Sequence, residues 1–178
     1  TFFEDRENPP EWQDLVLRET AQMGLNLVVE AQAQMCTPEK ISWVAERHPG
    51  CTVAIGLEAY DDRVLRFHVN KGFTTKQWHA AVQMLRDNNL RVKTYLLFKP
   101  PFMSEGDALV HTTSWLTNVA QYSDEVSVNP MNIQKNTIVD RLFRNNEYRP
   151  PWLWSLVEMI LRSHEHLGDE SCRIIVHP

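Results

Sequence analysis

The sequence predicts an α/β domain whose parallel strands form a partial TIM-like (β/α) barrel. Short apolar runs alternate with stretches of helical periodicity, which favours right-handed βαβ units in one parallel sheet. The apolar runs are nearly continuous, which is typical of strands covered on both faces. Because only five such runs occur, where a complete barrel has eight strands, we expect a partial barrel or an open sheet.

The predicted strands are short apolar runs bounded by polar or turn-forming residues. They differ from helical stretches in length and in their content of β-branched and aromatic residues. In chain order they cover residues 26–30, 51–57, 91–98, 125–128 and 172–176.

The predicted helices begin at prolines or at capping residues. Pro9-Pro10 opens a helix to about Met23, because proline is tolerated at a first helical position. Thr37, followed by proline, is the expected N-cap of a second helix.

Three further helices follow the same logic. Either of two adjacent threonines, Thr74 or Thr75, caps a helix to about residue 88. Ser104, with Asp107 three residues later, resembles a capping box and starts a helix to about residue 122. Pro150-Pro151 opens the last helix, to about residue 166.

Composition indicates a single domain over residues 1–178. Hydrophobic residues make up 43% and charged residues 23%, as in globular proteins. No apolar run approaches the roughly 20 residues of a membrane span, and no signal peptide is visible, so we expect a cytoplasmic protein with no membrane contact. The first residue is Thr rather than Met, which we interpret as an N-terminal truncation.

The net charge of −5 argues against a stand-alone nucleic-acid binder, because phosphate binding needs clustered cations. Residues 135–149 are locally basic, a pattern that an ordinary solvated helix face also produces. The cysteines, Cys36, Cys51 and Cys172, are too widely spaced for a disulfide framework or a metal motif. We therefore predict reduced structural cysteines and no metal ligand in this chain.

Polar residues recur where the predicted strands end. Glu30 closes the first strand, Glu58 follows the second, Tyr95 and Lys99 lie in and after the third, and Asn129 follows the fourth. Parallel α/β folds build their sites at the carboxyl ends of strands, so these residues suggest one shared pocket, although loops are polar in any protein.

Two kinds of chemistry are open to such a pocket. Two carboxylates and a lysine can bind a zwitterionic or cationic ligand by charge-assisted hydrogen bonds. Alternatively, Glu30 and Glu58 form a general acid/base pair. Dinucleotide-binding, P-loop and nucleophile-elbow motifs do not occur. His164 and His166 lie two positions apart, on different sides of a helix, and so cannot share a metal.

Residues 53–101 resemble the middle of radical S-adenosylmethionine (SAM) barrels of the elongator-type and coproporphyrinogen-oxidase-like group. The shared frame is a strand ending in G-L-E, a helix leading to N-K-G, a second helix and a strand followed by K-P-P. Residues 127–137 (SVNPMNIQKNT) and 148–154 (YRPPWLW) narrow the resemblance to the radical SAM subunit of archaeosine synthase and its relatives. The chain then resembles the C-terminal portion of a radical SAM core.

This resemblance implies SAM, a [4Fe–4S] cluster and a 5′-deoxyadenosyl radical that modifies a 7-deazaguanine-type base in tRNA. It also implies a partner enzyme that attaches lysine to that base. By resemblance, SAM contacts fall on Glu30, Glu58 and Lys71, and on Tyr95, where some relatives have Asp. The residues expected to face the substrate are Lys99, Asn129, Gln134 and Arg149.

The C-x3-C-x2-C motif of the family does not occur in the sequence. The cluster needs three thiolates on one loop, so we expect its ligands outside this chain and no activity from the chain alone. Two alternatives stay open at this point. The chain is a degenerate, non-catalytic barrel that serves as a scaffold, or it is an iron-independent α/β enzyme that uses Glu30 and Glu58.

Overall fold

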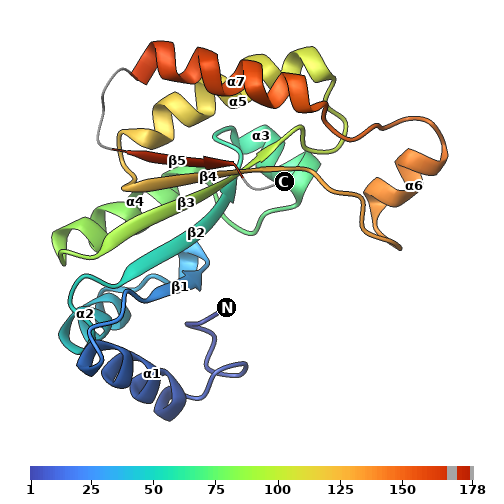
Figure 1. Cartoon of the computed structure of the whole chain (residues 1–178). Coiled ribbons are helices and arrows are strands. Elements are labelled where there is room, and N and C mark those ends of the chain that lie inside the picture. Colours follow the sequence, from blue (N-terminus) through green and yellow to red (C-terminus); the bar gives the residue numbers. More distant parts are fainter. Residues whose placement is uncertain (168–171, 177–178) are drawn as a thin grey trace.

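The computed structural model describes residues 1–167 and 172–176, with one five-stranded parallel sheet at its centre (Figure 1). The order of the strands in space follows their order in the chain, as in a (β/α) barrel. The predicted parallel α/β fold is therefore confirmed as part of a TIM-like barrel. The strands are β1 (Val28–Ala31), β2 (Thr52–Glu58), β3 (Arg91–Phe98), β4 (Glu125–Pro130) and β5 (Arg173–Val176).

The helices between the strands begin largely where the sequence predicts. Thr37, Thr74 and Ser104 are the N-caps of α2, α4 and α5, and each side chain accepts a hydrogen bond from the backbone N–H three residues on. These bonds satisfy N–H groups that the first turn of a helix leaves without a partner. The longer helices are α1 (Pro10–Gln22), α2 (Pro38–Arg47), α4 (Thr75–Asp87), α5 (Glu105–Ala120) and α7 (Leu153–Leu167).

Helix α7 starts at Leu153, two residues later than predicted. The backbone N–H of Trp152 donates to the Glu105 carboxylate, so residues 150–152 form a loop tied to α5 rather than a first helical turn. A short helix, α3 (Asp62–Val64), continues into a π-helical turn at Leu65–Val69 and leads to Asn70-Lys71-Gly72, where the family resemblance implies a helix. Another short helix, α6 (Ile138–Arg144), lies in the basic segment and outside the predicted helix ranges.

Among the described residues the helices cover only one face of the sheet (Figure 1). In β3, Val92, Thr94 and Leu96 are fully buried, whereas the alternating Lys93 and Tyr95 are only partly buried. Successive side chains of a strand point to opposite faces, so the first set packs on the helices and the second faces away from them. The prediction that both faces are covered is therefore wrong for the described residues, because polar and small residues alternate with the apolar ones.

One hydrophobic core lies between the sheet and the helices. Trp78 of α4, Phe98 of β3 and Leu116 of α5 are buried in it without solvent exposure. A second, separate cluster forms around Val139, Leu142 and Tyr148 in the segment that carries α6. Within the described residues, no helix is long and apolar enough to cross a membrane.

Candidate functional site

The face of the sheet that the helices leave uncovered, called the open face here, carries three of the eight predicted site residues, Glu30, Tyr95 and Asn129. Every second side chain of a strand points to this face, and the pairing register sets these side chains beside those of the neighbouring strands. Its members are Val28 and Glu30 of β1, Thr52, Ala54 and Gly56 of β2, Arg91, Lys93, Tyr95 and Leu97 of β3, Glu125, Ser127 and Asn129 of β4, and Arg173 and Ile175 of β5.

Gly56, Glu58 and Lys71 form a compact group at the end of β2, called the cradle here. Glu58 follows a register irregularity and has a φ of 71°, a left-handed conformation that is costly for a residue with a side chain. Its Oε1 accepts a hydrogen bond of 2.9 Å from Lys71 Nζ. A Cβ on Gly56 would lie 2.6 Å from this Oε1 and 3.2 Å from Lys71 Nζ, so a larger residue would force the Glu58 carboxylate to move from its present position.

The cradle is screened but open to a ligand. The side chains of Lys71 and Glu58 keep only 22% and 19% of their exposure, so their charges are partly desolvated. Lys71 also lines a hollow of about 490 Å³ beside the N-terminal end of α4, together with Arg66 and Phe73. When a zwitterionic ligand binds, Glu58 can pair with its ammonium group and Lys71 with its carboxylate, and these contacts replace the ion pair between the two side chains.

Tyr95 flanks the cradle on the neighbouring strand, where it is the register partner of Gly56. Burial raises the pKa of Tyr95 most, and Glu30 adds to this through its charge and a hydrogen bond, against the opposing charge of Lys93. The phenol therefore stays protonated at neutral pH and can donate to Glu30. The structure thus brings together Tyr95 and Glu30, two of the predicted SAM-binding residues.

A row of charges crosses the open face below Tyr95. Lys93 Nζ lies 2.7 Å from one carboxylate oxygen of Glu125, and Arg173 lies 3.5 Å from the other. Burial alone would lower the pKa of Lys93, but the hydrogen bond to Glu125 and the charges of Tyr95 and Glu125 raise it above its ordinary value. Each charge of the row therefore has a neighbour of opposite sign.

The two predicted carboxylates, Glu30 and Glu58, do not face each other. Glu30 is the register partner of Ala54, which lies four residues before Glu58 on β2. The register irregularity sets Glu58 opposite Leu96, three positions beyond the partner of Ala54, so the offset is roughly 10 Å along the sheet at about 3.3 Å per residue. Such a separation does not fit a directly coupled acid/base pair.

Lys99 is buried in a group of hydrogen-bonded residues, called the clamp here, which also contains Glu105, Tyr148 and the backbone of Arg149. It is only 7% exposed and has a φ of 60°. Its Nζ donates to Glu105 at 2.7 Å and to the backbone oxygen of Arg149 at 2.8 Å. The hydroxyl of Tyr148 in turn donates to the Lys99 carbonyl at 2.8 Å. Both acceptors of the Lys99 ammonium belong to the protein, and the expected contact of Lys99 with the substrate stays a prediction.

The remaining predicted substrate-facing residues are spread over the β4–α7 connection. Asn129 lies on the open face, where its side-chain oxygen accepts a hydrogen bond of 3.1 Å from Ser127. Gln134 and Arg149 are exposed, at the start and the end of the segment that carries α6. A hollow of about 430 Å³ lies next to Arg149 and is also lined by Lys99 and Tyr148.

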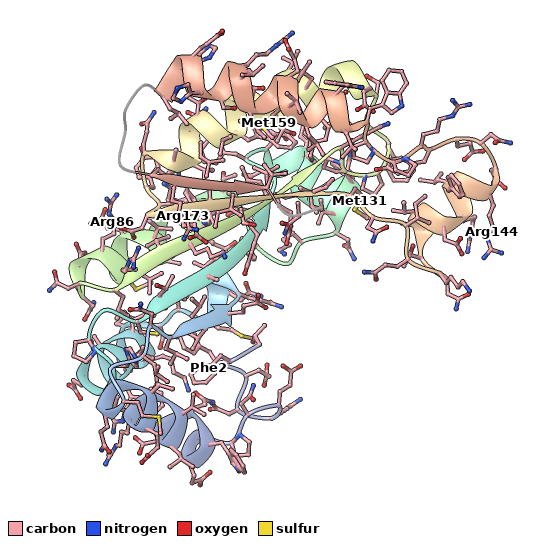
Figure 2. All side chains as sticks on the ribbon, viewed as in Figure 1. Phe2, Arg86, Met131, Arg144, Met159 and Arg173 are labelled. Atoms are coloured by element: carbon pink, nitrogen blue, oxygen red, sulfur yellow. The ribbon has the colours of Figure 1, made fainter. Side chains whose placement is uncertain are left out.

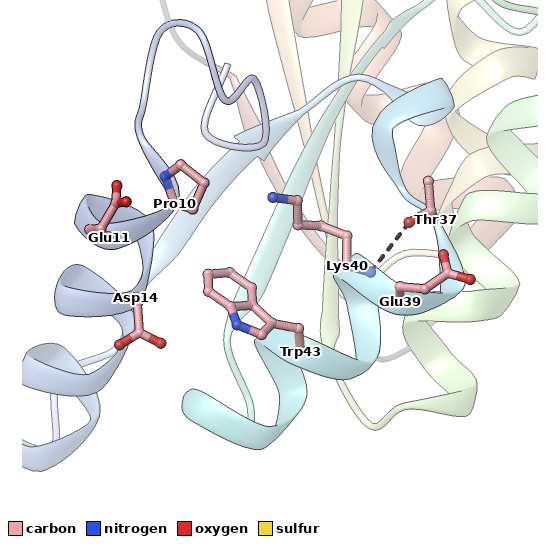
Figure 3. Close-up of a pocket in the computed structure, with 7 residues that line it drawn as sticks. All are labelled: Pro10, Glu11, Asp14, Thr37, Glu39, Lys40 and Trp43. Atoms are coloured by element: carbon pink, nitrogen blue, oxygen red, sulfur yellow. Dashed lines mark hydrogen bonds between the residues drawn. The ribbon is translucent and has the colours of Figure 1, made fainter.

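A hollow of about 690 Å³ lies elsewhere, between α1 and α2 (Figure 3). Lys40 and Trp43 line it from α2, and Asp14 from α1. The Lys40 ammonium is bound by protein acceptors, 3.0 Å from Asp5 and 3.0 Å from Gln13. This hollow shares none of the predicted site residues, and we do not assign it to the same function.

The cluster cofactor does not fit the described residues. In residues 1–167 and 172–176 no group of three or more His, Cys, Asp or Glu could hold a metal ion. Burial raises the pKa of both Cys36 and Cys51 to about 12, so neither thiol is a thiolate at neutral pH. The cradle, in contrast, offers the opposite charges of Glu58 and Lys71 beside Gly56, which has no side chain. A zwitterion such as SAM carries an ammonium and a carboxylate that fit these two charges.

Sequence reasoning missed the charged row of Lys93, Glu125 and Arg173. The signal was present in β3, where the polar Arg91, Lys93 and Tyr95 alternate with buried residues. A period of two is typical of a strand with one polar face. The prediction treated residues 91–98 as one apolar run and overlooked this alternation.

The chain is similar in sequence to known archaeal proteins. No protein-family model matches it. Archaeosine synthase subunit beta of Thermococcus kodakarensis is 35% identical over 165 residues, which is 90% of this chain and 51% of that protein. The same subunit of Methanosarcina acetivorans is 32% identical over 164 residues, which is 90% of this chain and 47% of that protein. The chain therefore spans about half the length of these curated relatives.

Solved structures support the same fold. The Elp3 protein of Methanocaldococcus infernus aligns over 97% of this chain and 41% of its own, with a TM-score of 0.71 and 18% identity. SuiB of Streptococcus suis, solved bound to S-adenosylmethionine, aligns over 96% of this chain and 36% of its own, with a TM-score of 0.56 and 12% identity. Over 90% of its length, the chain is homologous to archaeosine synthase subunit beta, and its fold resembles that of part of the Elp3 and SuiB structures.

Proposed function

We propose that this chain is the SAM-binding part of a radical SAM enzyme that modifies a 7-deazaguanine-type base in tRNA. The homology to archaeosine synthase subunit beta supports the reaction class. The cradle is the single observation that carries the proposal, since Gly56 leaves space for an ion pair of Glu58 and Lys71 at the carboxyl end of β2. In barrels of this type, that edge is where ligands bind.

The residues of the cradle would hold the amino-acid portion of SAM. The Glu58 carboxylate accepts hydrogen bonds from an ammonium group, and Lys71 donates to a carboxylate. Because the two side chains already pair at 2.9 Å, their charges are partly desolvated before a ligand arrives. When bound, SAM would supply a 5′-deoxyadenosyl radical as the hydrogen-abstracting group.

Tyr95 and Glu30 would shape the pocket beside the cradle. Tyr95 is protonated at neutral pH and presents its ring next to Gly56, where it can pack against a ligand. The Glu30 carboxylate lies close enough to act on the phenol, since it contributes to the raised pKa of Tyr95. We therefore assign Tyr95 and Glu30 to positioning, and the direct ionic contacts to Glu58 and Lys71.

No step is assigned here through the iron–sulfur cluster, because the described residues provide no thiolate set for it. Asn129, Gln134 and Arg149 would face the tRNA substrate, since they lie at or beyond the carboxyl end of β4. The curated relatives are named as beta subunits, which supports a partner enzyme that acts on the same tRNA.

The test uses the full-length protein, reconstituted anaerobically with iron and sulfide and given SAM and a reductant. We expect release of 5′-deoxyadenosine, and a loss of at least tenfold in Glu58→Ala, which removes a charge-assisted contact of about 1.5–3 kcal/mol. Glu46→Ala is the matched control, because the side chain of Glu46 is 75% exposed on α2.

Each other outcome selects an alternative. A wild-type protein that binds no SAM and releases no 5′-deoxyadenosine refutes the proposal and leaves a non-catalytic scaffold. Turnover of the tRNA base by an iron-free preparation also refutes it and requires an iron-independent enzyme.

A further inference from the structure

The connection between β4 and α7 forms a separate protrusion, called the knob here and defined as residues 131–149. It carries α6 and extends away from the sheet beyond the carboxyl end of β4 (Figures 1 and 2). In Figure 2, Met131 lies near the sheet and Arg144 near the far end of the knob. Buried Val139, Leu142 and Tyr148 give the knob a core of its own. The knob is therefore a folded element that reaches out from the barrel.

The base of the knob is fixed to the barrel by the clamp. Tyr148 belongs to the small core and donates to the Lys99 carbonyl at 2.8 Å. Lys99 donates in return to the backbone oxygen of Arg149 at 2.8 Å. Because these bonds join the knob to the end of β3, its position relative to the open face is defined.

The knob has the opposite charge to the rest of the chain. It contains the cations Lys135, Arg141, Arg144 and Arg149 against two carboxylates, which gives it a net charge of +2. The whole chain carries −5, so the other residues carry −7. All four cations are exposed.

The acidic residues of the knob contribute little to its outer surface. Asp140 is 12% exposed at its side chain and accepts hydrogen bonds from the backbone N–H of Asn136 and from Arg144. The bond from Asn136, then the bond and charge of Arg144, lower the pKa of Asp140, so it stays ionised but turned inward. Only Glu147 places a carboxylate in the open among the cations.

We propose that the knob binds the phosphate backbone of the RNA that carries the substrate base. The proposal rests on the proposed function and deepens it by naming the element that holds the tRNA. The residues outside the knob carry a net charge of −7 and repel RNA. A cationic element that binds RNA therefore has to extend away from them, as the knob does (Figure 1). Three of its four cations are arginines, whose planar groups bind phosphate oxygens in pairs.

The position of the knob suits this role. It begins directly after Asn129-Pro130, at the same edge of the sheet as the cradle. A nucleotide inserted at that edge would leave its flanking phosphates on the outside, where the knob stands. Phe143 and Ile138, which are 45% and 50% exposed, add apolar surface between the cations for a base or ribose.

The experiment measures tRNA binding by the full-length protein between 50 and 200 mM salt. The test variant is Lys135→Gln/Arg141→Gln/Arg149→Gln, which leaves Arg144 to pair with Asp140. The matched control is Arg6→Gln/Lys76→Gln/Arg91→Gln, with the same change in net charge at exposed residues outside the knob. An in vitro transcribed tRNA is the probe, and thermal melting confirms that both variants fold.

We expect the knob variant to bind tRNA at least tenfold more weakly and its salt slope to fall by about two to three, since each phosphate contact contributes roughly one. The control should stay within twofold of wild type. Equal weakening in both variants, or no change in the knob variant, overturns the inference and leaves the proposed function intact. If the knob variant instead loses only the partner enzyme, the knob is a protein contact and the inference is wrong. A wild-type protein that cleaves SAM but binds no tRNA refutes the inference and the tRNA part of the proposed function together.

Discussion

The carboxylate of Glu58 lies where the side chain of residue 56 would begin. An ideal Cβ on Gly56 would be 2.6 Å from Glu58 Oε1, closer than real contacts allow. The constraint on residue 56 therefore comes from the present position of the Glu58 carboxylate rather than from the backbone conformation of Gly56. Its replacement tests the cradle without removing either charge.

Gly56→Ala should weaken SAM binding by at least tenfold, because the added methyl group displaces Glu58 from Lys71 and costs a charge-assisted hydrogen bond of about 1.5–3 kcal/mol. Gly106→Ala is the control, since a Cβ there meets nothing within 4 Å. Equilibrium dialysis of SAM against the full-length protein gives the dissociation constants. Equal affinities for the two variants would remove the cradle from the SAM site.

Lys99→Met should lower the free energy of unfolding by about 2–3 kcal/mol. The change keeps the length of the side chain but leaves Glu105 without its cation, and the Arg149 carbonyl without its donor. Lys76→Met, at an exposed position of α4, is the matched control and should change stability by less than about 0.5 kcal/mol. Urea denaturation followed by circular dichroism measures both.

Glu105 makes the clamp sensitive to acid. Burial by itself raises the pKa of Glu105, but the hydrogen bonds from Lys99, the Trp152 backbone and Ser155, with the charge of Lys99, bring it below the ordinary 4.5. A lowered pKa stabilises the fold above pH 4.5, and this stabilisation is lost as the pH falls through the folded-state value.

Wild type should therefore exceed Glu105→Gln in stability at pH 6–7, and the difference should shrink as the pH falls below 4.5. Denaturation curves over this range provide the measurement. A difference that grows towards low pH contradicts the assigned direction of the shift.

Cys36 and Cys51 should resist alkylation at pH 8 in the folded protein. Burial raises the pKa of both thiols to about 12, and only the thiolate reacts. Mass spectrometry after iodoacetamide treatment should find both unmodified until denaturant is added. Rapid labelling of either residue without denaturant would show that its part of the core opens readily.

Two leucines on α7 separate its packed face from its outer face. Leu156 is 5% exposed and Leu153 is 73% exposed. Leu156→Ala should cost about 2–5 kcal/mol of stability, whereas Leu153→Ala should stay within about 0.5 kcal/mol. Similar losses in the two variants would mean that the outer face of α7 is covered in the full-length protein.

The strands and the capped helix starts could be predicted because they depend on local signals. Thr37, Thr74 and Ser104 each bind an N–H three residues away, and the strands are visible as apolar runs. The role of Lys99 could not be predicted, since its partners lie 6 and 50 residues away and meet only in the fold. The separation of Glu30 from Glu58 depends on strand register, which no local pattern of this sequence fixes.

The knob has a small core that is separate from the main one. Sequence changes on its surface therefore need no compensation inside the barrel, and the barrel can keep its cofactor residues while the knob diverges. If the knob holds the tRNA as proposed, transplanting residues 131–149 between relatives, with Lys99 and Glu105 retained as the anchor, should exchange RNA preference without altering the cradle.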